Sequence, residues 1–264
     1  MSTVDWRLVD MHCHLDRMSN AEEVAREAAG RGIALFDTTV TPADACAAQD
    51  LLGSFDNVRV GTGLHPWWLA DGRCGASDAA RATELAGKSP FVGEVGLDFG
   101  RRGDGAQKLQ TAAFEDICGA IAHHPLPHRV ISIHAIRAVS TALDILERTG
   151  ILGEDARRDT AVIFHWFSGT SDELARARRL GCHFSVNEHM LKSKRGREYA
   201  RQLPRERLLL ETDAPPGLDA PYSADALEAS LTRVLSAVAG ARNECPEELG
   251  SAIAETSTAM LGLA

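Results

Sequence analysis

Eight short apolar segments, with helical patterns between them, constrain the fold of this chain more than any other feature. The segments are residues 8–11, 33–36, 58–61, 91–95, 130–133, 161–164, 182–186 and 208–210. Their largely continuous apolar character is typical of strands covered on both faces in a parallel sheet. Eight such strands in alternation with helices predict an α/β fold of the (β/α)8 TIM-barrel type. An open, doubly wound sheet is the alternative.

Helix signals occupy the intervals between these segments. Thr41 followed by Pro42 is an N-cap with proline in the first turn, and Asn20 precedes a helix expected at 21–31. Further helices are expected at 78–87, 105–123, 137–149, 170–180, 223–239 and from residue 246 onward. No repeat, low-complexity tract or linker divides the chain, so we expect one domain spanning residues 1–264.

The composition excludes some classes of function. The formal net charge is −9, which argues against a protein that coats nucleic acid through bulk positive charge. The six cysteines form no Cys-x-x-Cys pair, and neither a leader core nor a run of about 18 apolar residues is present. We therefore expect a cytoplasmic protein with reduced thiols and no membrane contact.

Histidine and carboxylate side chains stand at or near the ends of the expected strands. His12 and His14 are two residues apart at the end of the first strand, so their side chains face the same way. Glu94 lies within the fourth apolar run, where a buried carboxylate needs a partner or a metal. The fifth, sixth and eighth runs lead to His134, His165 and Asp213.

Each of these residues has a structural alternative when taken alone. The two histidines would cap a strand, and Glu94 would form a buried salt bridge. Taken together, six ligand-type residues follow strands at one end of a parallel barrel, the end at which active sites lie. The sequence therefore predicts a metal site there.

Six sequence blocks resemble the signature blocks of the TatD family. They are DMHCHLD, GTGLHP, VGEVGLD, ISIH, FHWFSG and LLLETDAP, in this order between Asp10 and Pro215. The resemblance implies an amidohydrolase-like, metal-dependent hydrolase of a family that often trims single-stranded DNA ends. By motif position it implies the metal ligands His12, His14, Glu94, His134, His165 and Asp213.

Four blocks also resemble the TatD-like nucleases of Qat anti-phage systems. These blocks are FHWFSG, GCHFSV, MLKSKRGR and LLLETDAP. The narrower resemblance implies a role in antiviral defence and partners among other proteins of a defence operon.

Two positions depart from the family pattern. Members commonly carry H-x-R-x-A after the fifth strand, whereas Arg137 stands one place later here, so a phosphate contact by Arg137 is left open. Trp67 and Trp68 follow GLHP where small or polar residues are common. We interpret this pair as a pocket wall, with a base-stacking platform as the alternative.

Phosphodiester hydrolysis needs an activated water and relief of charge on phosphorus, which two divalent metals about 3.5–4 Å apart supply. Glu94 is the natural bridging ligand, since one carboxylate offers two oxygens. We expect His12, His14 and Asp213 at one metal, and the other metal at His134 and His165. The mixed ligands fit Mg, Mn, Zn or Ni without selecting one.

Four residues are candidates for catalysis: Glu94, Asp213, His65 and Glu211. Asp213 is also placed to accept a proton from the attacking water. Glu211 is expected to orient a histidine ligand, or alternatively to form an ordinary buried ion pair. His65 is expected to face the substrate, with a structural histidine as the alternative.

Two basic stretches are expected on the rim of the active-site end. Four positive charges follow the seventh strand, at Lys192, Lys194, Arg195 and Arg197, and two lie after the fourth strand, at Arg101 and Arg102. On an acidic chain, positive charge at this end predicts contacts to the phosphate backbone, and solvated surface is the alternative. The cluster His123, His124 and His128 lies at the opposite barrel end, and we assign it no catalytic role.

The favoured function is a metal-dependent deoxyribonuclease, an exonuclease acting on single-stranded DNA ends. An amidohydrolase-type deacylase or esterase on a small or tRNA-linked substrate is the first alternative, because the same metal set serves it. The second alternative is a mainly structural subunit of a defence complex.

Overall fold

The computed structural model describes residues 6–100, 104–154, 156, 159–217 and 219–263. Eight strands form one sheet in the order β1-β2-β3-β4-β5-β6-β7-β8, and each neighbouring pair is parallel. The strands are β1 Leu8–Cys13, β2 Ile33–Thr38, β3 Val58–Leu64, β4 Phe91–Asp98, β5 Arg129–Ile136, β6 Thr160–His165, β7 His183–Val186 and β8 Leu208–Leu210.

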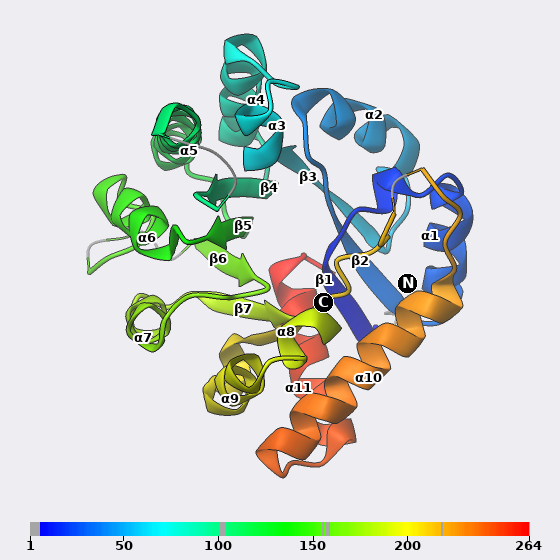
Figure 1. The fold of residues 1–264 in the computed structure, drawn as a ribbon. Helices are drawn as coiled ribbons and strands as arrows, with labels where there is room; N and C mark the ends of the chain where they lie inside the picture. Colours follow the sequence, from blue (N-terminus) through cyan, green and yellow to red (C-terminus); the bar gives the residue numbers. More distant parts are fainter. Residues whose placement is uncertain (1–5, 101–103, 155, 157–158, 218, 264) are drawn as a thin grey trace.

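The ring of strands closes between the end of β8 and the end of β1. The amide of Asp213 donates to the carbonyl of His12 at 2.9 Å, and the amide of His14 donates to the carbonyl of Ala214 at 2.7 Å. Figure 1 shows the strands in a ring with the helices around them. The predicted (β/α)8 barrel is therefore confirmed.

The helices follow the strands in alternation, with additional short ones. They are α1 Ala21–Gly30, α2 Pro42–Leu52, α3 Pro66–Ala70, α4 Ala76–Lys88, α5 Asp104–His123, α6 Val139–Arg148, α7 Ser171–Arg179, α8 Glu188–Leu191, α9 Lys194–Gln202, α10 Ala224–Arg242 and α11 Pro246–Met260. Two 3₁₀ turns, Leu15–Arg17 and Arg205–Arg207, complete the set. Among the described residues, no helix is both long and apolar enough to cross a membrane.

Sequence periodicity misses the three short helices α3, α8 and α9. The helices α3 and α8 are only five and four residues long, and α9 carries few apolar residues, so none of them shows a clear 3.6-residue apolar pattern. A side-chain cap begins each of them, and the cap of α3 is His65. Asn187 accepts from the amide of Met190 at 2.8 Å, and Ser193 accepts from the amide of Gly196 at 2.9 Å.

The core has an outer and an inner part. The larger cluster lies between the strands and the helices, and includes Leu35, Val92 and Leu143. A smaller cluster joins strands from opposite sides of the ring and therefore fills the barrel interior. It contains Trp6, Val9, Met11, Ala34, Phe36, Val130, Ile163, Leu209 and Leu261. Val9 and Met11 precede His12 on β1, so this smaller apolar cluster lies next to the polar residues at the strand ends.

Candidate metal centre

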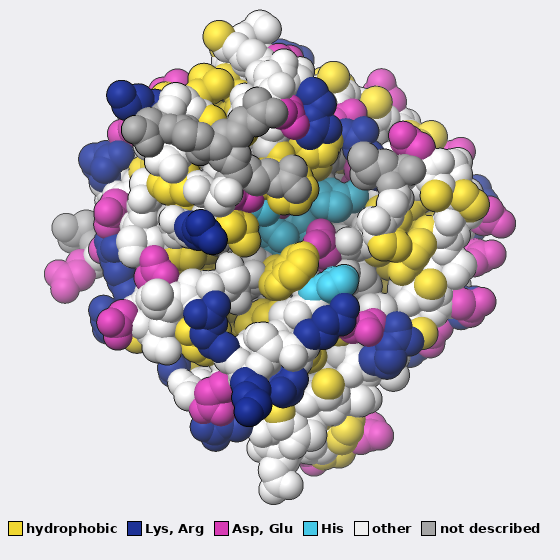
Figure 2. All heavy atoms as spheres, in the orientation of Figure 1, with side chains coloured by type: hydrophobic (Ala, Val, Ile, Leu, Met, Phe, Trp, Pro, Cys, Tyr) yellow, Lys and Arg dark blue, Asp and Glu magenta, His cyan; other side chains and the backbone are white. Residues whose placement is uncertain are grey.

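The structure brings all six predicted metal ligands together at one mouth of the barrel. They are contributed by or directly follow β1, β4, β5, β6 and β8. Five of them, His14, Glu94, His134, His165 and Asp213, line a cavity of about 460 Å³. In Figure 2 this cavity is the central hollow, with histidine side chains visible inside it.

One oxygen of Glu94 faces a group of histidine nitrogens. Glu94 Oε1 lies 2.7 Å from His134 Nδ1, 2.8 Å from His165 Nε2 and 3.2 Å from His65 Nε2. A carboxylate oxygen has two lone pairs, so three nitrogens exceed what it can satisfy through hydrogen bonds alone. His134 Nδ1 and His165 Nε2 are 3.4 Å apart. This group fits a cation bound between nitrogen and oxygen ligands.

The other oxygen of Glu94 faces a second group. Glu94 Oε2 lies 3.5 Å from both His12 Nε2 and His14 Nε2. Asp213 Oδ1 lies 3.8 Å from His12 Nε2 and 3.4 Å from His14 Nε2. Ligand atoms held at about 2.0–2.2 Å around one tetrahedral cation lie about 3.3–3.6 Å from one another. The four atoms therefore have the spacing of a ligand set.

His12 supplies the clearest sign that this second group fits a metal. Its Nε2 is buried, and no described residue forms a hydrogen bond with it. An unsatisfied buried nitrogen is costly unless an ion or another partner completes its coordination. Glu94 therefore divides its two oxygens between two ligand groups, which is the geometry expected of a bridging carboxylate.

The opposite nitrogens of the two β1 histidines are held by hydrogen bonds. His14 Nδ1 lies 2.6 Å from the carbonyl of Thr38, which can only accept, so Nδ1 carries a proton and Nε2 is the nitrogen that faces Glu94 and Asp213. His12 Nδ1 lies 2.7 Å from Ser132 Oγ. Such contacts orient metal-ligating histidines and select their tautomer.

The electrostatic field of the second group is negative. Burial alone would lower the pKa of His14, but the carboxylates of Asp213 and Glu94 raise it to about 9. Burial likewise opposes ionisation of Asp213, but its hydrogen bond with His14 and the nearby histidines lower its pKa to about 2. Both carboxylates are thus charged at neutral pH, and the site attracts cations.

Asp98, the last residue of β4, orients His134. Asp98 Oδ2 lies 3.2 Å from His134 Nε2 and also accepts from Trp67 Nε1. A proton on His134 Nε2 leaves the lone pair of Nδ1 directed at the Glu94 group. Sequence reasoning gave Asp98 no role, although it ends the same VGEVGLD block as Glu94.

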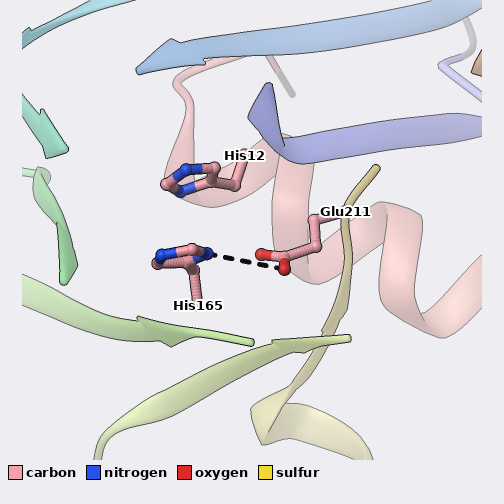
Figure 3. Close-up of side chains that lie close together, drawn as sticks. All are labelled: His12, His165 and Glu211. Atoms are coloured by element: carbon pink, nitrogen blue, oxygen red, sulfur yellow. Dashed lines mark ion pairs between the residues drawn. The ribbon is translucent and has the colours of Figure 1, made fainter. Parts of the chain in front are cut away.

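Glu211 lies behind His165 and is fully buried. Its Oε1 is 3.6 Å from His165 Nδ1 and accepts from Asn187 Nδ2 at 2.7 Å, and Ser185 Oγ donates to its Oε2. Figure 3 shows the carboxylate directed at His165, with the ring of His12 parallel to that of His165. The two ring centroids are 3.9 Å apart. This placement favours the predicted orienting role over direct contact with substrate.

His65 caps helix α3 and also faces the cavity. Its Nδ1 accepts from the amide of Trp67 at 3.1 Å, which leaves the proton on Nε2, directed at Glu94. Burial is the largest influence on its pKa, which falls to about 4, so the ring is neutral. His65 is therefore a neutral donor to Glu94 on the cavity wall.

The two tryptophans after His65 have different environments. Trp67 lines the cavity. Trp68 packs against the core and lies beneath the guanidinium of Arg73, whose central carbon is 3.5 Å from the ring centroid. Trp67 has the position of a pocket wall.

The predicted basic rim divides into residues with different surroundings. Lys192, Lys194 and Arg195 are exposed, and Arg195 Nη2 donates to the carbonyl of Ser168 at 3.3 Å. Arg197 is exposed as well, but it donates to the carbonyls of Leu191 and Lys192, at 2.7 and 3.2 Å, and so joins α9 to the end of α8. The other predicted pair, Arg101 and Arg102, lies outside the described residues.

Arg137, whose role the sequence left open, lines the cavity. It is exposed, and no described residue accepts a hydrogen bond from its guanidinium. Arg137 therefore still lies at the site, although it stands one position later than the arginine of the family pattern.

Comparison with known proteins agrees with this geometry. The family model described as TatD related DNase matches residues 9–262. The chain is 26% identical over 250 residues to the 3'-5' ssDNA/RNA exonuclease TatD of Citrobacter rodentium (strain ICC168), covering 92% of this chain and 91% of that protein. It is 32% identical over 136 residues to the deoxyribonuclease Tat-D of Schizosaccharomyces pombe, covering 52% of this chain and 41% of that protein.

A solved structure shows the same fold. The crystal structure of YJJV, a TatD homolog from Escherichia coli K12, superposes with a TM-score of 0.78 at 22% identity and covers 97% of this chain and 98% of that chain. The resemblance seen in the sequence blocks is thereby confirmed, and the chain belongs to the TatD related DNase family.

Proposed function

We propose that this protein is a metal-dependent nuclease that removes nucleotides from the ends of single-stranded DNA. The observation that carries the proposal is the pair of ligand groups sharing Glu94 at the base of an open cavity. The names of the relatives from C. rodentium and S. pombe, an exonuclease and a deoxyribonuclease, support nucleic acid as the substrate class.

Two divalent cations, when bound, would supply a nucleophilic water at neutral pH and neutralise charge on the phosphate. Glu94 Oε2, His12, His14 and Asp213 would hold one of them. The other would lie between Glu94 Oε1 and the nitrogens of His134 and His165. The donor set of nitrogen and carboxylate oxygen suits Mg, Mn, Zn or Ni.

The remaining residues position the substrate and move protons. Asp213 is ionised and lines the cavity, so its carboxylate is available to accept a proton from the attacking water. Arg137 offers an exposed guanidinium on the same cavity, with the donor geometry that phosphate oxygens prefer. Asp98 and Glu211 hold the two histidines of one ligand group in place.

The test is hydrolysis of end-labelled single- and double-stranded DNA and RNA by protein stripped with chelator and then reloaded with each metal. We expect hydrolysis to need metal, and Asp213→Asn or His134→Ala to lower kcat by about 100-fold or more. Unchanged far-UV circular dichroism would show that the variants fold. Hydrolysis that survives chelator, or none with any metal, would overturn the proposal.

One observation favours a second candidate, the deacylase or esterase. Trp67, Ile136 and Trp166 give the cavity an apolar wall, which suits an acyl group. Esters and acylated tRNA assayed beside the oligonucleotides, with the same metals, distinguish the two. Faster turnover of esters than of oligonucleotides would select the deacylase.

The role in anti-phage defence, with partners from a defence operon, stays a prediction from the four resembling blocks, and the cytoplasmic location stays a prediction from the composition of the sequence. Phage plating on cells carrying the operon, with wild-type protein or Asp213→Asn, tests it. Protection lost with the variant would favour an enzymatic role, and protection retained would favour a structural subunit.

A further inference from the structure

Trp166 presents a large apolar ring at the edge of the cavity. It follows His165, the last residue of β6, and lines the cavity together with Arg137 and Asp213. It is 37% exposed, and among the described large apolar residues only Leu51 and Leu109 are more exposed. Burial of a tryptophan normally stabilises a fold, so its exposure beside the candidate site points to a binding role.

The backbone at Trp166 supports this interpretation. Its φ is +40°, in the left-handed region that bulky residues rarely adopt. Such a conformation persists only where the surrounding structure imposes it, and these positions gather at functional sites. The sharp change of direction after β6 places the indole on the cavity rim.

A second ring extends the aromatic surface. His189 of α8 stacks on Trp166, with ring centroids 5.1 Å apart and an interplanar angle of 27°. Lys192 Nζ lies 3.2 Å from His189 Nδ1 and holds the imidazole in place. His189 therefore covers part of the indole, while the indole also borders the cavity.

Positive charge surrounds this pair. Lys192 contacts His189, Arg195 contacts the carbonyl of Ser168 two residues beyond Trp166, and Arg137 lines the same cavity. Figure 2 shows apolar and histidine side chains together at the centre of this face, with Lys and Arg side chains nearby. An acyl chain gains nothing from cations at its border, whereas a nucleotide presents a flat base beside a charged phosphate.

We infer that Trp166, backed by His189, is a stacking surface for one nucleobase of the substrate strand, next to the bond that is cleaved. The inference rests on the proposed nuclease function and names the residues that hold the nucleotide. A base within a duplex is already stacked between its neighbours, so this surface favours an unpaired strand end. Trp166 thereby sets substrate preference without taking part in the chemistry.

The test combines variants with an abasic scan of the substrate. Single-stranded oligonucleotides carry one tetrahydrofuran residue at the first, second, third or fourth nucleotide from the cleaved end. Wild type, Trp166→Ala, Trp166→Phe and His189→Ala are compared, with Leu51→Ala as a control that removes exposed apolar surface away from the cavity. Bound metal and the thermal midpoint of each variant are measured in parallel.

We expect wild-type kcat/KM to fall about tenfold at one abasic position, within the range for loss of a base–aromatic stack. Trp166→Ala should show a similar fall on the intact strand and no further fall at that position. Trp166→Phe should retain most activity and the same position dependence, His189→Ala should weaken that dependence, and Leu51→Ala should behave as wild type.

A loss in Trp166→Ala that is equal on intact and abasic strands would overturn the inference while leaving the nuclease function standing. So would an absence of any loss. If wild type hydrolyses no oligonucleotide with any metal, the proposed function fails first and the inference fails with it. If Trp166→Ala binds less metal or unfolds, Trp166→Leu takes its place, because leucine keeps apolar volume but has no ring. The same comparison of intact and abasic strands then tests the inference.

Discussion

Glu94 illustrates how a single buried carboxylate organises the site. An ionised carboxylate inside a protein is unfavourable unless it is paired. Burial opposes its ionisation, but the nearby rings of His65 and His165 and the hydrogen bond with His134 bring its pKa well below the usual value. The histidines that surround Glu94 therefore stabilise its charge.

Arg129, the first residue of β5, connects several segments of the scaffold through its buried guanidinium. It is fully buried, and its guanidinium donates to the carbonyls of Ser89, Ile121, His124 and Gly87 at 2.9–3.0 Å. We expect Arg129→Ala to lower the free energy of unfolding by about 3 kcal/mol or more, because several buried carbonyls lose their donors. Urea unfolding at neutral pH measures this loss.

Arg148→Ala is the matched control for this experiment. Arg148 is exposed and pairs with Glu115 on the surface, so its removal should cost less than about 1 kcal/mol. Equal losses in the two variants would show that the buried position of Arg129 is not what matters.

His183, at the start of β7, makes stability depend on pH. Burial and the nearby Arg207 guanidinium lower its pKa from 6.5 to about 4. Between these values the unfolded chain binds a proton that the folded chain excludes, so stability should fall as the pH drops from 6.5 toward 4. His183→Gln should flatten this decline. Urea unfolding of both metal-free proteins across this range compares the slopes, and parallel slopes would contradict the assignment.

At the scale of elements, the segment from β7 to α9 shows how short helices divide a charge cluster. The four basic residues looked equivalent as a sequence run. Lys192 follows the end of α8, Ser193 caps α9, and the other three lie within α9, where Arg197 bonds back to the end of α8. All four side chains are exposed, but only the guanidinium of Arg197 is held at this junction.

Because Arg197 is held at the helix junction, the prediction for nucleic-acid binding is restricted to the other three basic residues. Replacing Lys192, Lys194 and Arg195 by Gln should weaken binding of a single-stranded oligonucleotide to the metal-free protein, in which no hydrolysis is expected. It should also reduce the slope of log affinity against log salt by about 2, at about 0.7 per phosphate contact. Affinity measured at several salt concentrations, with and without the three changes, decides this.

Arg197→Gln separates structure from phosphate contact. It should lower the thermal midpoint by loosening the junction of α8 and α9, and change the salt slope little. If the triple variant keeps both the affinity and the slope of its parent, the rim does not contact phosphate.

At the scale of the whole molecule, the candidate ligands connect parts of the chain that are far apart. His12 and Asp213 are separated by most of the sequence, yet their backbones hydrogen-bond where the barrel closes. A cation held by both, together with Glu94 of β4, would link the first, middle and last strands. Metal binding is therefore expected to stabilise the closed barrel as a unit.

Chelation tests this expectation directly. Metal at about 100 times its dissociation constant adds about 2.7 kcal/mol to the folded state. For a chain of this size that corresponds to a rise of roughly 5–10 °C in the thermal midpoint. Differential scanning fluorimetry with chelator and with each metal measures it, and Asp213→Asn should lose most of the gain. If the thermal midpoint of the wild-type protein does not change with metal, the chain has no tight metal centre.

Much of the barrel and of the candidate site could be predicted from local sequence. Each of the eight apolar runs overlaps a strand, because a buried parallel strand needs continuous apolar residues and little else. The strands β4 and β5 extend beyond the predicted ends, to Asp98 and Ile136, because polar residues at a strand end still pair through their backbone. The six candidate ligands were found because position on a strand dictates which end of the barrel a residue reaches.

Other features are decided by tertiary structure alone. The orientation of His134 by Asp98, the stack of His189 on Trp166 and the diversion of Arg197 to a helix junction all depend on contacts between separate segments. Hydrophobic periodicity reports which face of an element is buried, but not where a loop directs a side chain. The path of a loop depends on backbone angles such as the positive φ of Trp166. Residues that are close in space, but not in sequence, impose such angles. The sequence alone therefore determined the barrel and the set of candidate ligands at its mouth, and the packing of the loops decided which other residues line the cavity.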